Sequence, residues 1–133
     1  GRINGFAFGQ TFSIPSRQAT LGYKAILENY RANIRYENYE NYGFELTYGE
    51  PFWWGWQSSY KYSYNDKGHD SDFPLFGHRS DRLETLRMNF TKSISLCWSA
   101  NISATMSDSR STINIYKRRS NNYSATFNYM CFK

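Results

Sequence analysis

Apolar and polar residues alternate with a period of two along most of this 133-residue chain. Because successive side chains of a β-strand point to opposite faces, such alternation predicts strands with one apolar and one polar face. No stretch shows the sustained 3.6-residue period of a helix. In one of the clearest segments the apolar residues Trp98, Ala100, Ile102, Ala104 and Met106 alternate with Ser99, Asn101, Ser103, Thr105 and Ser107. We expect seven strands, at about 6–14, 18–30, 42–50, 54–64, 85–91, 98–107 and 123–129.

The connections between these segments are of two kinds. Short turns are expected near Pro15-Ser16, from Gly49 to Phe52 and near Ser95-Leu96. Longer polar loops are expected at about 31–41, 65–82 and 108–121. Short turns at one end and long loops at the other are typical of an up-and-down antiparallel meander, and of a transmembrane β-barrel of the bacterial outer membrane.

The content of the two faces favours the membrane barrel. The polar face carries mainly Ser, Thr, Asn, Gln and Gly, and few of the long charged residues that cover a soluble sheet. Aromatic residues make up 20% of the chain, yet the mean hydropathy is −0.74, too low for a helical span. Aromatic girdles at both membrane interfaces are a property of outer-membrane barrels. We expect the membrane-interface aromatics to be Trp53, Trp54, Trp56 and Trp98 beside the short turns, and Tyr62 and Tyr64 toward the long loops.

Seven strands leave the barrel incomplete, because a closed bacterial barrel has an even number. One interpretation is an eight-stranded barrel, with part of the missing strand at Ala32 to Tyr39. The other is the C-terminal part of a larger barrel. An open sheet edge in lipid leaves backbone groups unpaired at several kcal/mol each. The second interpretation therefore requires further barrel strands or a partner chain.

The C-terminal third resembles a known group of barrels. The segments are 78–82 (HRSDR), 86–90 (LRMNF), Cys97-Trp98 and 109–118 (SRSTINIYKR). They resemble the closing strands of barrels attached to periplasmic tetratricopeptide domains, which include the surface lipoprotein assembly modifiers and, by architecture, the exopolysaccharide export porins. In that group an R-x-D element opens the antepenultimate strand. The resemblance implies translocation of a polymer or polypeptide through the outer membrane of a Gram-negative bacterium.

The function predicted from these observations is a non-enzymatic pore or translocation channel without a cofactor. The alternatives are a structural or binding barrel with a plugged lumen, and a soluble β-sandwich that binds glycans through exposed aromatic residues. In a pore, the rare lumenal charges would bias selectivity. The expected lumen-lining residues are Ser59, Lys61, Arg87, Ser99, Asn101, Ser103, Thr105, Ser124, Thr126 and Asn128.

Basic residues gather in the predicted loops of a chain with a net charge of +5. If these loops are extracellular, they face the phosphates of outer-membrane lipid and lipopolysaccharide, which arginine contacts in bidentate fashion. A solvated charged rim is the alternative. Single-stranded nucleic acid is disfavoured as a partner, because the charges lie at loops and not along one groove. The residues predicted to bind anionic lipid are Arg79, Arg82, Arg110, Lys117, Arg118 and Arg119.

The remaining chemistry-bearing residues give weaker signals. The histidines and aspartates of the loop at 69–81 match no metal-site spacing, so we expect no metal, and no Ser-His spacing indicates catalysis. If the last two strands form a hairpin centred near residue 114, Cys97 and Cys131 lie opposite each other at the periplasmic end. A disulfide there and two reduced, packed thiols are both open.

Overall fold

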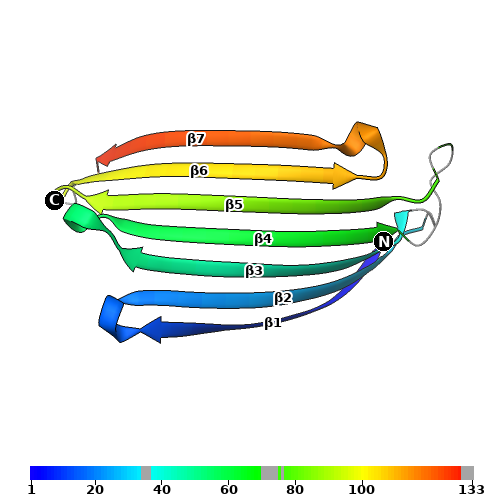
Figure 1. Ribbon diagram of the computed structural model, residues 1–133, viewed down its shortest axis with the longest axis horizontal. Coiled ribbons are helices and arrows are strands. Elements are labelled where there is room, and N and C mark those ends of the chain that lie inside the picture. Colours follow the sequence, from blue (N-terminus) through cyan, green and yellow to red (C-terminus); the bar gives the residue numbers. More distant parts are fainter. Residues whose placement is uncertain (34–36, 70–74, 76, 130–133) are drawn as a thin grey trace.

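The computed structural model describes residues 1–33, 37–69, 75 and 77–129. These residues form one antiparallel sheet of seven strands that follow one another in chain order (Figure 1). All seven predicted strands and the up-and-down meander are confirmed. The strands are β1 (Arg2–Ile14), β2 (Ala19–Arg31), β3 (Tyr39–Pro51), β4 (Gln57–His69), β5 (Ser80–Ser93), β6 (Trp98–Ser111) and β7 (Arg118–Tyr129).

Short connections gather at one end of the sheet, which we call the turn end. They include the 3-10 turns η1 (Pro15–Arg17) and η3 (Trp53–Gly55). At the opposite loop end, the connection from β6 to β7 carries η4 (Asn114–Tyr116). Among the described residues, no helix has the length and apolar character needed to cross a membrane.

The strands reach further toward the loop end than the sequence predicted. β4 continues to His69 and β6 to Ser111, although both stretches were predicted to be loop from residues 65 and 108. The prediction was wrong there because polar side chains ended the apolar alternation, whereas the backbone ladder continues regardless of side-chain polarity. At the turn end, Trp54 and Trp56 belong to the turn around η3 and not to β4.

The sheet formed by the described residues is open. β1 and β7 are its two edges, and their arrows point in the same direction in Figure 1. The closed barrel that the sequence predicted is therefore not seen. The proposed eighth strand at 32–39 is not seen either: Tyr39 already begins β3, and residues 34–36 lie outside the described part.

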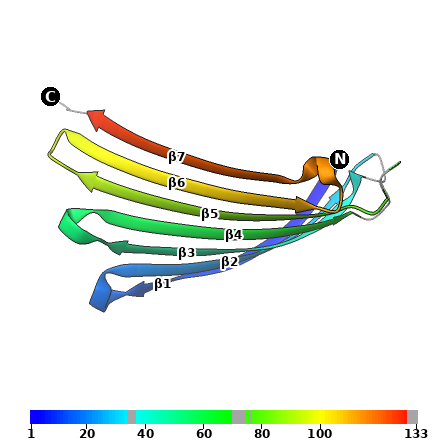
Figure 2. The ribbon, with the colours of Figure 1, turned by 45° about the horizontal axis from the view of Figure 1, so that its top comes forward.

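The sheet is a single curved layer without a hydrophobic core (Figure 2). The only buried hydrophobic residues among those described are Ala19, Ala100 and Ile113. The described residues form no second sheet, so the sandwich alternative lacks its second layer. A sheet normally buries one face against another element. The exposed faces of this sheet are therefore the candidates for contact with lipid, ligand or partner.

Candidate functional site

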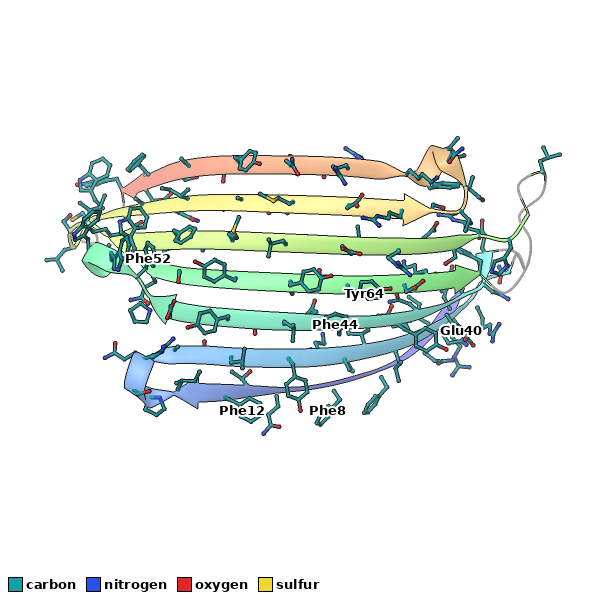
Figure 3. The ribbon with its side chains drawn as sticks, in the orientation of Figure 1. Phe8, Phe12, Glu40, Phe44, Phe52 and Tyr64 are labelled. Carbon is teal, nitrogen blue, oxygen red and sulfur yellow. The ribbon has the colours of Figure 1, made fainter. Side chains whose placement is uncertain are left out.

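One face of the sheet, here called the apolar face, carries large hydrophobic side chains from every strand; many are exposed on β1, β2, β3, β6 and β7, and those of β4 and β5 are half-buried. Figure 3 shows Phe8, Phe12, Phe44, Phe52 and Tyr64 projecting from this side. Phe6 is 65% exposed and Phe127 is 70% exposed. Such a continuous apolar surface is far larger than a soluble monomer presents to water. A central row of directly opposed residues on this face consists of Phe12, Leu21, Tyr48, Tyr60, Met88, Ala104 and Tyr123.

The apolar residues form a band that crosses the strands obliquely. On β1, β2 and β3 the last apolar residues before the loop end are Phe6, Leu27 and Tyr42, which share one row. On later strands the apolar side chains end progressively earlier. The last ones are Tyr64 on β4, Leu86 on β5, Met106 on β6 and Tyr123 on β7.

This loop-end margin retreats by three rows, or six residues, over the six steps from β1 to β7. At about 3.3 Å per residue and about 4.8 Å between strands, the slope is about 35°. The turn-end margin moves the same way, from Ile14 on β1 to Trp98 on β6 and Tyr129 on β7, two rows further on. By the same spacings its slope is about 25°. The band thus runs at about 25–35° to the rows, and its loop-end margin reaches the lower limit of the tilt of about 35–45° that strands adopt in membrane barrels.

Aromatic residues concentrate at the turn-end margin of the band. Trp53 and Trp54 are 72% and 84% exposed, and Trp98 packs against Tyr129 with 4.9 Å between ring centroids. Trp54 has a φ of 56°, which is unfavourable for a bulky residue and is set by the tight turn. Of the predicted interface aromatics, Trp53, Trp54, Trp56 and Trp98 lie at this margin, and Tyr64 lies at the loop-end margin. Tyr62 lies one row inside it, in the middle of β4.

Beyond the loop-end margin, the apolar face of β4–β7 becomes charged. Arg82 and Arg110 are directly opposite each other, and Arg119 lies in the neighbouring row. Each has a carboxylate within reach: Arg82 Nη2 is 3.6 Å from Asp66, and Asp108 is 2.9 Å from Arg110 and 3.6 Å from Arg119.

The other residues predicted to bind anionic lipid lie elsewhere. Arg118 is opposite Ser109 on the other face, and Lys117 Nζ donates to Asn114 Oδ1 over 2.7 Å. Arg79 is engaged by Asp81, as described below. The structure therefore does not bring all six predicted residues together, and the outward group is Arg82, Arg110 and Arg119.

The second face, here called the polar face, carries the ten predicted lumen-lining residues in one phase. Ser59 and Ser103 share a row with Ser124, and the Ser103 and Ser124 hydroxyls lie 2.7 Å apart. A hollow of about 650 Å³ lies over the middle of this face. Six of the ten residues line it, together with Asn89, which the sequence reasoning did not include. The six are Ser59, Lys61, Arg87, Asn101, Ser103 and Thr105.

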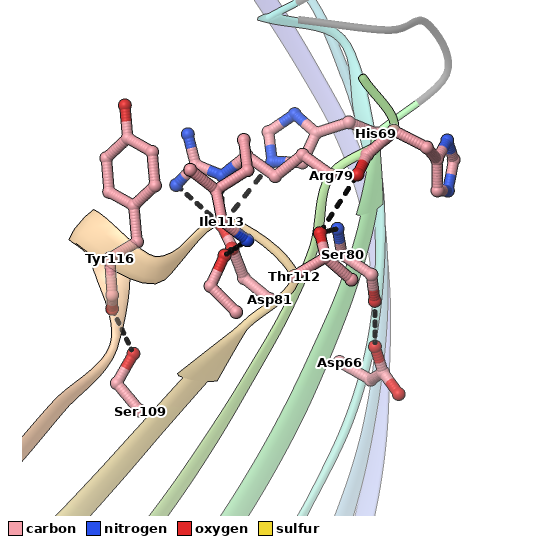
Figure 4. A network of polar contacts seen from close by, with 11 residues as sticks. Asp66, His69, Arg79, Ser80, Asp81, Ser109, Thr112, Ile113 and Tyr116 are labelled. Carbon is pink, nitrogen blue, oxygen red and sulfur yellow. Dashed lines mark hydrogen bonds and ion pairs between the residues drawn. The ribbon is translucent and has the colours of Figure 1, made fainter. Parts of the chain in front are cut away.

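A network of polar contacts joins β4, β5 and the β6–β7 connection at the loop end (Figure 4). Asp81 is its centre. Its carboxylate accepts from Arg79 Nε at 2.7 Å and from Ser111 Oγ at 2.5 Å, and His69 Nε2 lies 3.6 Å away. The Arg79 guanidinium also lies over the Tyr116 ring, 3.7 Å from its centroid.

Backbone contacts tighten the same network. Thr112 Oγ1 accepts from the Ser80 amide at 3.0 Å and donates to the His78 carbonyl at 2.9 Å. The Thr112 amide donates in turn to the Ser80 carbonyl. The two sequence segments around residues 78–82 and 109–118, which lie far apart in the chain, therefore meet here. Sequence reasoning singled out both segments but did not predict their contact.

Asp81 lies outside the apolar band, five residues before Leu86 on β5. Burial by itself raises the pKa of the Asp81 carboxyl. The hydrogen bonds from Arg79 and Ser111 and the charges of Arg79 and His69 outweigh burial, so the pKa lies below its usual range. The carboxylate is thus held ionised as the anchor of two strands and a loop.

The remaining predicted sites are only partly within the described residues. Cys97 is disulfide-bonded, and Cys131, the chain's other cysteine and its predicted partner, lies outside them. The last described pair of this hairpin is Trp98 opposite Tyr129. No group of three potential metal ligands occurs within the described residues, and residues 70–74 of the histidine- and aspartate-rich loop are outside them.

Comparison with known proteins identifies no relative: no family model, curated protein or solved structure matches the chain. The resemblance to tetratricopeptide-linked barrels therefore stays a prediction from the quoted segments.

Proposed function

We propose that this chain forms part of the wall of an outer-membrane β-barrel that acts as a pore or translocation channel. In this proposal the apolar face contacts lipid and the polar face lines the lumen. The observation that carries it is the oblique apolar band. A band inclined to the rows of paired residues by about the angle at which barrel strands tilt is the outline that a flat bilayer imposes on tilted strands.

The length of the band supports the same proposal. The apolar alternation covers nine residues on β1 (6–14), on β2 (19–27) and on β6 (98–106). At about 3.3 Å per residue and a tilt of about 35°, nine residues rise by about 25 Å. This equals the apolar height of about 25 Å typical of outer-membrane barrels.

Further strands complete the wall in this proposal. β1 and β7 are exposed along almost their whole length, and they run in the same direction. Pairing β7 directly with β1 would be parallel, so an all-antiparallel barrel needs an odd number of strands between them. These strands belong to a longer polypeptide or to a partner chain, and they satisfy the backbone groups that lipid leaves unpaired.

The outward arginines of β5, β6 and β7 are the residues that would contact lipid headgroups in this proposal. Arg82, Arg110 and Arg119 lie just beyond the loop-end margin, at the height of headgroups. Their side chains are partly exposed, with 63% for Arg110 and 75% for Arg119. We assign to them the contact with phosphates of lipopolysaccharide, with the turn end in the periplasm and the loop end outside a Gram-negative cell.

The first test asks whether the chain needs a bilayer. The purified chain is folded into vesicles containing lipids brominated at defined depths, and tryptophan quenching is measured. We expect the strongest quenching by bromines near the headgroups, because Trp53, Trp54, Trp56 and Trp98 lie at the turn-end margin. A β-rich monomer that is soluble without detergent would contradict the proposal.

The second test addresses the pore. Planar bilayers containing the folded protein are expected to show discrete conductance steps. Heat-modifiable migration on unheated gels confirms in parallel that a compact barrel is present. A compact, bilayer-embedded species without conductance would favour the alternative of a structural barrel with a plugged lumen.

A further inference from the structure

Two like charges face each other in the middle of the polar face. Lys61 of β4 is directly opposite Arg87 of β5, and the next residue in the row is Thr105 of β6. Like charges at directly opposed positions destabilise a sheet. Most nearby positions on this face carry small uncharged residues. The repulsion is therefore confined to this pair, and a negative charge beside it would relieve it.

Among the residues that the structure describes, a carboxylate compensates only one of the two charges. Lys61 Nζ lies 2.9 Å from the Glu45 carboxylate. Arg87 forms no hydrogen bond and no ion pair with any residue that the structure describes. The opposed pair Arg82 and Arg110 on the other face is different, because Asp66 and Asp108 lie beside it.

The uncompensated guanidinium lines the hollow of about 650 Å³ on the polar face. Around it are hydroxyl and amide groups that can donate hydrogen bonds. Lys61 supplies a second positive charge on the same wall. The hydrogen-bonding residues that share the hollow with this pair are Asn89, Asn101, Ser103 and Thr105.

We infer that Lys61 and Arg87 form a binding site for an oxyanion, that is, a solute with a carboxylate, sulfate or phosphate group. The Arg87 guanidinium donates two parallel hydrogen bonds to oxygens of such a group, and the surrounding hydroxyls and amides donate to the remaining oxygens. Oxyanion binding at this site does not require a pore. Its effect on conduction rests on the proposed function: within a pore, the same site makes the lumen prefer anions over cations.

The first experiment measures binding without requiring a pore. The full chain, folded in detergent or lipid, is heated in sodium sulfate and in sodium chloride at equal ionic strength. Sulfate is expected to raise the midpoint of unfolding more than chloride does for the original chain, for Arg87→Lys and for the control Lys92→Gln. Lys92 lies on the apolar face of β5, opposite Ala100. Its replacement removes a positive charge outside the hollow and shows whether the loss of any one positive charge changes the sulfate effect.

Arg87→Gln and Lys61→Gln are expected to lose the part of the sulfate effect that binding contributes, and to keep only the general stabilisation that sulfate gives a folded protein. Both replacements keep a long polar side chain, so the fold is preserved, and β-sheet content by circular dichroism verifies it. An equal sulfate effect in the original chain, Arg87→Gln and Lys92→Gln would overturn the inference.

The second experiment measures the reversal potential across planar bilayers under a salt gradient. The original chain is expected to prefer chloride over potassium. For an ion path about 7 Å from the guanidinium, removing the unit charge lowers the anion concentration by about threefold and raises the cation concentration by about threefold, so the preference falls by about sevenfold. Arg87→Gln should therefore lose most of it, Arg87→Glu should invert it, and Lys92→Gln should leave it unchanged.

The two experiments separate the possible failures. A chain that conducts without anion preference, or whose preference survives Arg87→Gln, contradicts the anion site and leaves the pore intact. A chain that never conducts contradicts the pore, and the sulfate comparison then decides the anion site by itself.

Discussion

The two halves of the sheet, β1–β3 and β4–β7, carry different kinds of residue at the loop end. On β1–β3 the apolar face stays apolar as far as the row of Phe6, Leu27 and Tyr42. On the opposite face at the same end, the rings of Tyr30 and Tyr39 stack across β2 and β3, with 5.1 Å between centroids. On β4–β7 the corresponding positions carry charges, and the network around Asp81 holds the strands. The two halves differ because the boundary of the apolar band crosses the strands obliquely. Within one row, a position can therefore lie inside the band on β3 and outside it on β7.

The prediction with the largest expected effect concerns two residues in one row of the apolar face, on different strands. Leu46 of β3 and Asn121 of β7 belong to the same row of the apolar face. We expect Leu46→Arg to lower the free energy of unfolding in lipid vesicles by about 2–4 kcal/mol, and Asn121→Arg by about 0–1 kcal/mol. The difference arises because only Leu46 lies at mid-band.

Urea titrations followed by tryptophan fluorescence measure both variants. Leu46→Ala is the control for the lost side chain, since it removes the packing without adding a charge. Equal costs for the two arginine variants would mean that the band follows the rows and that no tilted bilayer boundary exists.

The second prediction removes the centre of the loop-end network of β4–β7. Asp81→Asn is expected to lower the free energy of unfolding by about 1–3 kcal/mol, because Arg79 loses its charged partner in a half-buried site. Hydrogen exchange should also show faster exchange of the Thr112 amide, which donates to Ser80. Unchanged protection of Thr112 would show that the backbone contacts hold the loop without the carboxylate.

The same carboxylate makes this half of the sheet sensitive to acid. The pKa of Asp81 is lowered in the folded state, so its contribution to stability is fully present above the ordinary aspartate pKa of about 4 and is lost as the pH falls through the lower folded pKa. We expect the free energy of unfolding to fall between about pH 4 and about pH 2. In Asp81→Asn this part of the pH dependence should disappear when the free energy of unfolding is measured over the same pH range. If the variant keeps the full pH dependence, another group causes it.

The smallest expected effect concerns the outward charges of β4–β7. Asp66→Asn removes a carboxylate that lies 3.6 Å from the Arg82 guanidinium, with both side chains partly exposed. We expect a loss of about 0–1 kcal/mol, because exposed pairs contribute little. A loss as large as that of Asp81→Asn would mean that this charged patch is buried by lipid or by another chain.

Much of the fold could be predicted because its main signal is local. The alternation at Trp98 to Ser107 predicts a strand and also which side chains share a face, and all ten predicted lumen residues do share one. The ends of the strands were harder. At His69 and Ser111 the ladder continues through polar residues, so hydropathy carried no sign of it.

The candidate sites depend on register, which is set between segments far apart in the chain. The loop residues predicted to bind lipid illustrate this: Arg82 and Arg119 face outward, whereas Arg79 bends to Asp81 and Tyr116. No local pattern distinguishes these arginines, because each sits in a similar polar stretch of sequence.

The seven strands, their up-and-down order and the division into an apolar and a polar face can be predicted from the sequence, because a period of two acts within a single strand. Three features depend on the tertiary structure: the oblique apolar band, the position of Arg87 opposite Lys61 with no carboxylate beside it among the described residues, and the contact of Asp81 with Ser111. Each of these follows from the alignment of neighbouring strands, where a shift of a single residue moves every side chain to a different partner and to the other face.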